Sequence, residues 1–142
     1  MYHNKTILIT GASSGLGRNM ALHYAMERKT IGKPIAEHQA IQLKLAEMST
    51  RAAAAEQLVH QAANKFDRHE RCDLEAGQAK FFASEAAVQN SLDAMRVFGG
   101  YSYSPEYEIE RFYRDAPLLC IGEGTNEIQR MIIAKQMVAR AS

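Results

Sequence analysis

A long apolar stripe with helical spacing occupies the middle of the chain. Between residues 41 and 66, apolar side chains recur at alternating steps of four and three residues: Ile41, Leu45, Met48, Ala52, Ala55, Val59, Ala62 and Phe66. Most of the intervening positions are polar, and this spacing puts the apolar side chains on one face of a helix of about seven turns. The alanines in the stripe predict that a second helix packs closely against this face.

Helices are also predicted on both sides of this segment. One begins near Leu16 and ends before Gly32 and Pro34, because glycine often ends a helix and proline prevents its continuation. The polar stretch DRHERCD separates the long helix from the next one, which is expected over about residues 74–98 with Asp73 as its cap. The predicted fold is mainly α: an antiparallel four-helix bundle in a single structural domain, preceded by a short N-terminal β-strand.

Two shorter signals predict the remaining helices. Ser104 followed by Pro105 is a typical helix start and is expected to open a short helix that ends near Asp115. Thr125 can cap a last helix, because its hydroxyl oxygen can accept a hydrogen bond from a free backbone N–H. The apolar residues of this last helix are expected to face the bundle: Ile128, Met131, Ile132 and Val138.

The composition limits the classes of partner. The chain has 142 residues with 17 Lys and Arg against 16 Asp and Glu, so its net charge of +1 gives no electrostatic basis for binding nucleic acid or a membrane surface. No apolar run is as long as a membrane span and no signal peptide is apparent, so a cytoplasmic location is expected. His69 and Cys72 form only a sparse polar cluster, and no metal site is predicted.

The N-terminal residues form a different pattern. The apolar run KTILIT, at residues 5–10, is typical of a β-strand, and a turn containing Gly11, Gly15 and Gly17 separates it from a helix. Such a turn can cradle the phosphates of a dinucleotide at the helix N-terminus. Residues 1–25 resemble the start of the short-chain dehydrogenase/reductase family, which binds NAD(P). No second strand and no Tyr-x-x-x-Lys pair follow, so NAD(P) binding is not expected and the glycines are interpreted as a relic.

The remainder, residues 20–142, resembles another family. Three segments carry the resemblance in order: YAMERKTIGKPIAEHQAIQ, AMRVFGGYSYSPEYEIERFYRDA and GEGTNEIQR. All three are similar to the C-terminal helical domain of the acyl-CoA dehydrogenases. In that family an enzyme-bound FAD takes a hydride from Cβ of an acyl-CoA thioester while a glutamate removes the α-proton. The resemblance implies that Glu123 is this base; the alternative is an exposed loop carboxylate in front of a helix.

The same resemblance implies six FAD contacts. Arg28 corresponds to an arginine that meets the pyrophosphate of an FAD held by a neighbouring subunit, although it could equally complement a helix C-terminus. Thr125 corresponds to a threonine that contacts the flavin, although a helix cap would explain it as well. The other positions that carry over are Gln39, Arg96, Gly99 and Gly100.

The resemblance also bears on the activity. Acyl-CoA dehydrogenases have two further domains, which hold one side of the flavin ring and much of the thioester, and these 142 residues resemble neither. We therefore expect a truncated, ancestrally FAD-dependent acyl-CoA dehydrogenase that is inactive alone. The alternative is a non-catalytic, self-associating helical bundle or a fusion by-product, and an NAD(P)-dependent reductase ranks last.

The two resemblances meet inside one predicted helix, around ALHYAMERK. This position leads to the interpretation of the chain as a chimera of a reductase start and a dehydrogenase domain. Homo-oligomers, either dimers or tetramers, are expected because the predicted helices have broad apolar surfaces. Full-length acyl-CoA dehydrogenase subunits are a second candidate partner.

Overall fold

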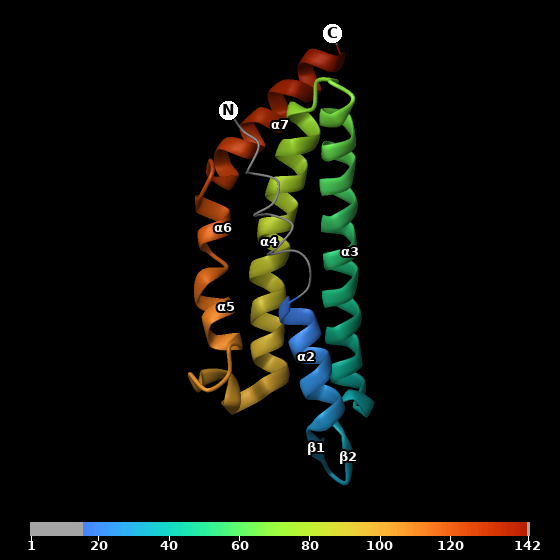
Figure 1. Cartoon of the computed structure of the whole chain (residues 1–142), viewed down its shortest axis with the longest axis vertical. Helices are drawn as coiled ribbons and strands as arrows, with labels where there is room; N and C mark the ends of the chain where they lie inside the picture. Colours follow the sequence, from blue (N-terminus) through green and yellow to red (C-terminus); the bar gives the residue numbers. More distant parts are fainter. Residues whose placement is uncertain (1–15, 142) are drawn as a thin grey trace.

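Two long helices, α3 (Gln39–Asp67) and α4 (Asp73–Phe98), lie antiparallel at the centre of the molecule (Figure 1). The computed structural model describes residues 16–141. Helix α2 (Leu16–Glu27) packs beside the C-terminal half of α4, and α7 (Asn126–Ala141) packs beside its N-terminal half. The short helices α5 (Ile109–Asp115) and α6 (Leu118–Ile121) run along α4 on the side away from α3 and lead into α7. The prediction of a mainly helical bundle is confirmed, while the strand predicted at residues 5–10 lies outside the described residues.

The apolar stripe of α3 faces α4 as its spacing predicts. Its central members are buried: Met48, Ala52, Ala55, Val59 and Ala62. Ile41 and Leu45 are partly buried against the same core, whereas Phe66, at the end of the stripe, is 52% exposed. Small alanine side chains let the two helix backbones approach closely, so the stripe positions α4 along nearly the full length of α3.

Helix α4 is covered by neighbours on several sides, and it accommodates them with small and polar side chains. Ala79, Ala83, Ala86 and Ala94 are buried on it. Among its buried polar residues, Asp93 binds Arg51 of α3 and Arg96 of α4, and the Asn90 Nδ2 donates to the Met48 carbonyl at 3.1 Å. These bonds satisfy the polar groups that burial removes from water.

Several predicted helix boundaries differ from the structure. Asp73 is the first helical residue of α4 rather than its cap, and it pairs with Arg71 at 2.7 Å. Helix α5 starts at Ile109, because residues 99–103 form a 3₁₀ helix and Ser104 accepts a local bond from the Glu106 N–H at 3.3 Å instead of capping α5. Thr125 does cap α7, where its Oγ1 accepts a bond from the Ile128 N–H at 3.4 Å.

A short hairpin follows α2 where the sequence indicated only a helix end. Strands β1 (Lys29–Thr30) and β2 (Lys33–Pro34) pair antiparallel. Their two-residue turn has positive φ at both positions, 51° at Ile31 and 77° at Gly32, which is typical of a type I′ turn. A β-branched residue rarely adopts positive φ, so Ile31 concealed this turn from sequence reasoning.

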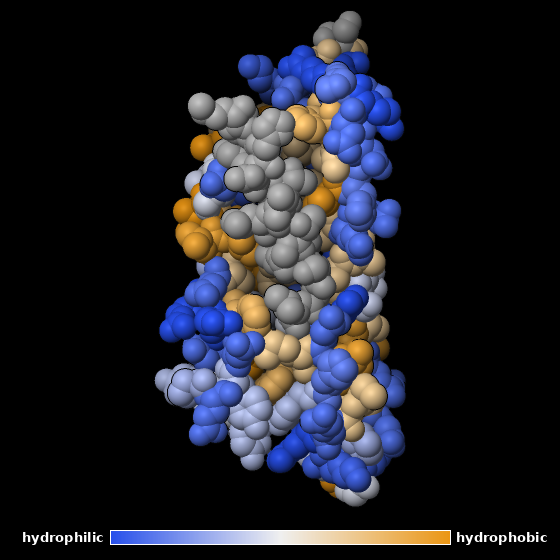
Figure 2. Space-filling model, in the orientation of Figure 1, coloured by the Kyte–Doolittle hydropathy of each residue, from blue (hydrophilic) through white to orange (hydrophobic). Residues whose placement is uncertain are grey.

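The inward orientation predicted for the last helix is wrong for three of its four residues. Ile128, Met131 and Val138 are exposed, Met131 by 71%, and only Ile132 is half-buried. Figure 2 shows exposed apolar side chains gathered over α6, in contrast to the polar edge along α3. In residues 16–141 no helix is long and apolar enough to cross a membrane.

A buried carboxylate joins three helices at the end of the bundle where α7 finishes. Glu75 of α4 accepts hydrogen bonds from Arg140 of α7, at 2.7 and 3.0 Å, and from Lys65 of α3 at 2.7 Å. The Arg140 guanidinium, together with Lys65, lowers the pKa of Glu75 from 4.5 to about 2. Because this pKa is lower in the folded chain, the carboxylate stabilises the fold above pH 4.5 and loses that effect as the pH falls towards 2.

We therefore expect Glu75→Gln to lower the free energy of unfolding by about 2 kcal/mol at pH 7, allowing for the partial exposure of both cations. At pH 3 the difference from wild type should shrink to less than half, because the unfolded wild type is then largely protonated. Urea unfolding at both pH values measures it. An equal difference at pH 7 and pH 3 would show that the ion pairs do not stabilise the fold.

Candidate functional site

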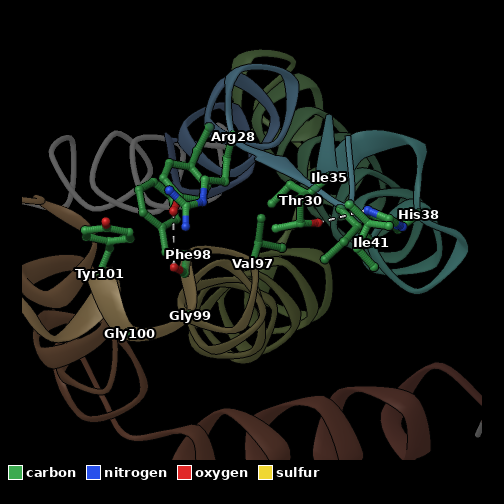
Figure 3. Close-up of a pocket in the computed structure, with 12 residues that line it drawn as sticks. Arg28, Thr30, Ile35, His38, Ile41, Val97, Phe98, Gly99, Gly100 and Tyr101 are labelled. Carbon is green, nitrogen blue, oxygen red and sulfur yellow. Dashed lines mark hydrogen bonds between the residues drawn. The ribbon is translucent and has the colours of Figure 1, made fainter. Parts of the chain in front are cut away.

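A cavity of about 650 Å³ opens where the hairpin, the start of α3 and the end of α4 meet. Figure 3 shows Arg28 and Tyr101 on one side of it and His38 and Ile41 on the other, with Val97 and Phe98 between them. Apolar and aromatic walls with a few convergent polar groups are typical of small-ligand sites.

Arg28 supplies the positive charge of this cavity. Its backbone is fixed by bonds from its N–H to the Tyr24 carbonyl and from the Ile35 N–H to its own carbonyl, both 2.8 Å long. Its guanidinium carbon lies 5.3 Å from the centre of the Tyr101 ring. A guanidinium held over an aromatic face keeps its fork of N–H donors available for a phosphate or carboxylate.

Aromatic stacking forms the wall beneath Arg28. The Tyr24 and Phe98 rings stack with their centres 4.1 Å apart, and the Tyr24 hydroxyl donates to the Phe98 carbonyl at 3.4 Å. Burial raises the pKa of Tyr24, so this hydroxyl stays protonated and neutral. Across the cavity, Thr30 Oγ1 and His38 Nε2 share a hydrogen bond of 3.0 Å, which orients both polar groups.

Two glycines leave the backbone open at the end of α4. Gly99 has φ 62° and ψ −137°, a conformation that side chains disfavour. A Cβ added to Gly99 or Gly100 would have no neighbour within 4 Å. Gly99 is therefore required by its backbone conformation and not by crowding, and both glycines leave the peptide groups accessible to a ligand.

The structure brings only some of the predicted FAD contacts together. Arg28, Gly99 and Gly100 line the cavity. Gln39 is exposed at the first residue of α3, next to the lining residue His38, and Arg96 is exposed and paired with Asp93 at 3.0 Å. Neither Gln39 nor Arg96 lines the cavity.

Glu123 and Thr125 lie in a different part of the molecule. They belong to the loop between α6 and α7, where Glu123 lines a smaller cavity of about 240 Å³ together with Lys80 and Gln129. Lys80 precedes Gly99 by 19 positions on α4, and at 1.5 Å per helical residue the two cavities are roughly 28 Å apart. One chain therefore does not combine its proposed base with the Arg28 cavity.

Sequence reasoning missed three residues that shape these sites. His38 and Tyr101 each directly neighbour a predicted contact in the sequence, and that adjacency was the available signal. Lys80 had no signal, because a lysine on a helix is normally expected in solvent. Of the glycines predicted as a relic nucleotide turn, Gly11 and Gly15 lie outside the described residues. Gly17 lies in α2, where an added Cβ would sit 3.9 Å from Ala94.

Comparison with known proteins identifies the family of this chain. The family model described as "Acyl-CoA dehydrogenase, C-terminal domain" matches residues 8–138. The chain belongs to the acyl-CoA dehydrogenase family. It is 51% identical to an acyl-CoA dehydrogenase of Bacillus subtilis (strain 168), over 83% of this chain and 31% of that protein.

Solved structures of the family agree. The chain superposes on butyryl-CoA dehydrogenase from Megasphaera elsdenii with a TM-score of 0.89 and 35% identity, covering 94% of this chain and 34% of that one. It superposes on the FAD complex of PigA with a TM-score of 0.88 and 29% identity, covering 95% of this chain and 35% of that one. The chain thus spans about a third of the length of the relatives that it matches.

The match also bears on the reductase resemblance. It begins at residue 8, so it includes most of the segment that the sequence analysis assigned to a reductase start. The acyl-CoA dehydrogenase family therefore accounts for these residues as well, and the match gives no support to a chimera.

Proposed function

We propose that this chain is the FAD-binding helical part of an acyl-CoA dehydrogenase and does not catalyse turnover alone. The observation that carries the proposal is the cavity lined by Arg28, Gly99 and Gly100, whose chemistry fits the pyrophosphate of a dinucleotide. Arg28 offers charge-assisted bonds to the phosphates, and the two glycines let a ligand approach the backbone. Tyr101 and Phe98 offer aromatic surface.

Glu123 would act as the base at a second site. Bound FAD supplies the hydride acceptor for α,β-dehydrogenation of an acyl-CoA. The carboxylate of Glu123 would take the α-proton, with Thr125 beside it toward the flavin. Since the Arg28 cavity lies at the other end of α4, one FAD would contact Arg28 of one copy and Glu123 of another. Association of copies is thus part of the proposal.

The exposed apolar residues favour self-association as the second candidate function. Leu118 and Ile121 of α6 and Met131 and Val138 of α7 are all well exposed in the single chain. Exposed apolar patches of this kind commonly mark protein interfaces. A homo-oligomer, or assembly with full-length dehydrogenase subunits, would cover them.

A titration of FAD tests the proposal. We expect the fluorescence of added FAD to change saturably on binding and ADP to compete for the site, because the Arg28 cavity recognises the diphosphate end. Riboflavin, which lacks that end, is the matched ligand control and should not compete. Competition by riboflavin but not by ADP would contradict recognition at Arg28, and no binding at all would leave only the self-associating bundle.

A further inference from the structure

A buried lysine fastens both ends of the Glu123 loop to α4. Lys80 is only 6% exposed, and its Nζ donates to Asn126 Oδ1 at 2.7 Å and to the Cys120 carbonyl at 3.2 Å. Cys120 belongs to α6 and Asn126 is the first residue of α7. The four residues between these two helices, 122–125, include Glu123. One ammonium group therefore holds the chain just before and just after the loop.

Asn126 completes this attachment. It is 2% exposed, and its Oδ1 also accepts a bond from Ser84 Oγ at 3.0 Å. Its Nδ2 donates to Glu85 Oε1 at 2.8 Å. Lys80 and Ser84 lie on one side of α4, since residues four apart are neighbours on a helix, and Glu85 directly follows Ser84. The first residue of α7 is thus bound to α4 by three side chains.

The loop itself has a backbone that needs such support. Glu123 has φ 58°, and Gly124 has φ 88°. A Cβ at Gly124 would lie 3.0 Å from Gln129 Nε2. Left-handed conformations of non-glycine residues are sparsely populated and persist only where the surrounding structure fixes them. The bonds of Lys80 and Asn126 hold the two ends of the loop to α4 and so help to fix this conformation.

Burying the ammonium group of Lys80 costs free energy. Burial lowers its pKa, and its two hydrogen-bond acceptors are neutral oxygens rather than carboxylates. A hydrophobic side chain of the same length would be easier to bury at this position. Lys80 and Glu123 line the same cavity of about 240 Å³, so the lysine lies close enough to the loop to affect the position of the Glu123 carboxylate.

We propose that Lys80 is a positioning residue for Glu123: it ties α6 and α7 to α4 and thereby fixes the conformation of the loop that carries the carboxylate. This inference rests on the proposed role of Glu123 as the base. The lysine acts through Cys120 and Asn126, and it need not touch the substrate.

The test is Lys80→Met, which keeps the length of the apolar stem and removes the ammonium. Amide hydrogen exchange and the intraresidue HN–Hα NOE of Glu123 are measured by NMR on the folded chain, since this NOE is strong at positive φ, where the two protons lie close together. We expect exchange at Gly122 and Gln129, whose N–H groups bond the Leu118 and Thr125 carbonyls, to rise about tenfold relative to the centre of α4, the effect of losing one charged hydrogen bond. The Glu123 NOE should weaken as negative-φ conformers become populated.

Lys65→Met is the matched control. Lys65 also bonds a buried α4 residue, Glu75, but it makes no bond to the loop, so this variant should lower stability without changing the Glu123 NOE. If Lys80→Met does not fold, Asn126→Ser removes the amide acceptor and should weaken the NOE in the same way.

A Glu123 NOE and relative exchange that stay as in wild type, in whichever of these two loop variants folds, would overturn the proposal and leave Lys80 as a core residue. The assay contains neither FAD nor thioester. A loop that loosens as expected in a chain that fails to bind FAD would therefore refute the proposed function and not the role of Lys80.

Discussion

Replacing Arg28 with glutamine is expected to weaken FAD binding by about 10- to 100-fold, the effect of losing charge-assisted bonds worth roughly 1.5–3 kcal/mol. Arg28 is the arginine of the cavity beside Gly99 and Gly100, and its guanidinium already lies 5.3 Å from the Tyr101 ring centre. Glutamine keeps a polar side chain but loses the charge and the bidentate geometry that a pyrophosphate requires. The FAD titration described above measures the change.

The matched control for this variant is Arg68→Gln. Arg68 is exposed beyond the C-terminus of α3, pairs with Glu70 at 2.6 Å and lines neither cavity. Its replacement should leave FAD affinity unchanged within about twofold. Equal weakening in the two variants would mean that FAD responds to net charge alone. Unchanged FAD affinity in Arg28→Gln would contradict the proposal that FAD binds in this cavity.

Met48→Ala is expected to destabilise the fold by about 2–5 kcal/mol, the usual cost of emptying a fully buried site of this size. Met48 is 0% exposed at the centre of the α3 stripe. It packs in the same core as Ala94, Val97 and Phe98 of α4, so its loss leaves a cavity between the two long helices. The hydrogen bond from the Asn90 side chain uses only the backbone carbonyl of Met48 and should survive. Urea unfolding gives the difference in free energy.

Met26→Ala removes the same atoms from the surface and serves as its control. Met26 is 57% exposed on α2, so its truncation should change stability by no more than about 0.5 kcal/mol. A loss for Met48→Ala as small as the one expected for Met26→Ala would contradict the core assigned to Met48. A loss for Met26→Ala as large as the one expected for Met48→Ala would indicate that α2 is covered in solution, as it would be in an oligomer.

The extent to which sequence predicted this structure follows from the physics of each element. The buried face of α3 could be predicted because one face of this helix packs against one neighbouring helix. Apolar residues then recur in the sequence with the period of a helix. The extent of α4 was also predicted, but not its buried face, since Ser84, Asn90 and Asp93 are buried only because specific partners satisfy them. Periodicity carries no information about such partners.

The predicted inward orientation of the α7 residues was wrong for a related reason. Ile128 and Met131 have the spacing of a buried face, but the pattern does not say whether the covering surface belongs to the same chain or to another. For the site, the family resemblance alone named Arg28, Gly99 and Gly100 as FAD contacts, and the structure shows that these three residues line one cavity. The sequence did not show that Glu123 is far from these residues, because that distance depends on the length of α4 between the two cavities.

The visible absorption spectrum of the protein, saturated with FAD and then exhaustively dialysed, tests the central claim most directly. The account predicts that a flavin band remains after dialysis and that it is lost in Arg28→Gln but kept in Arg68→Gln. A wild-type protein that becomes colourless under these conditions would contradict the claim that this domain holds FAD.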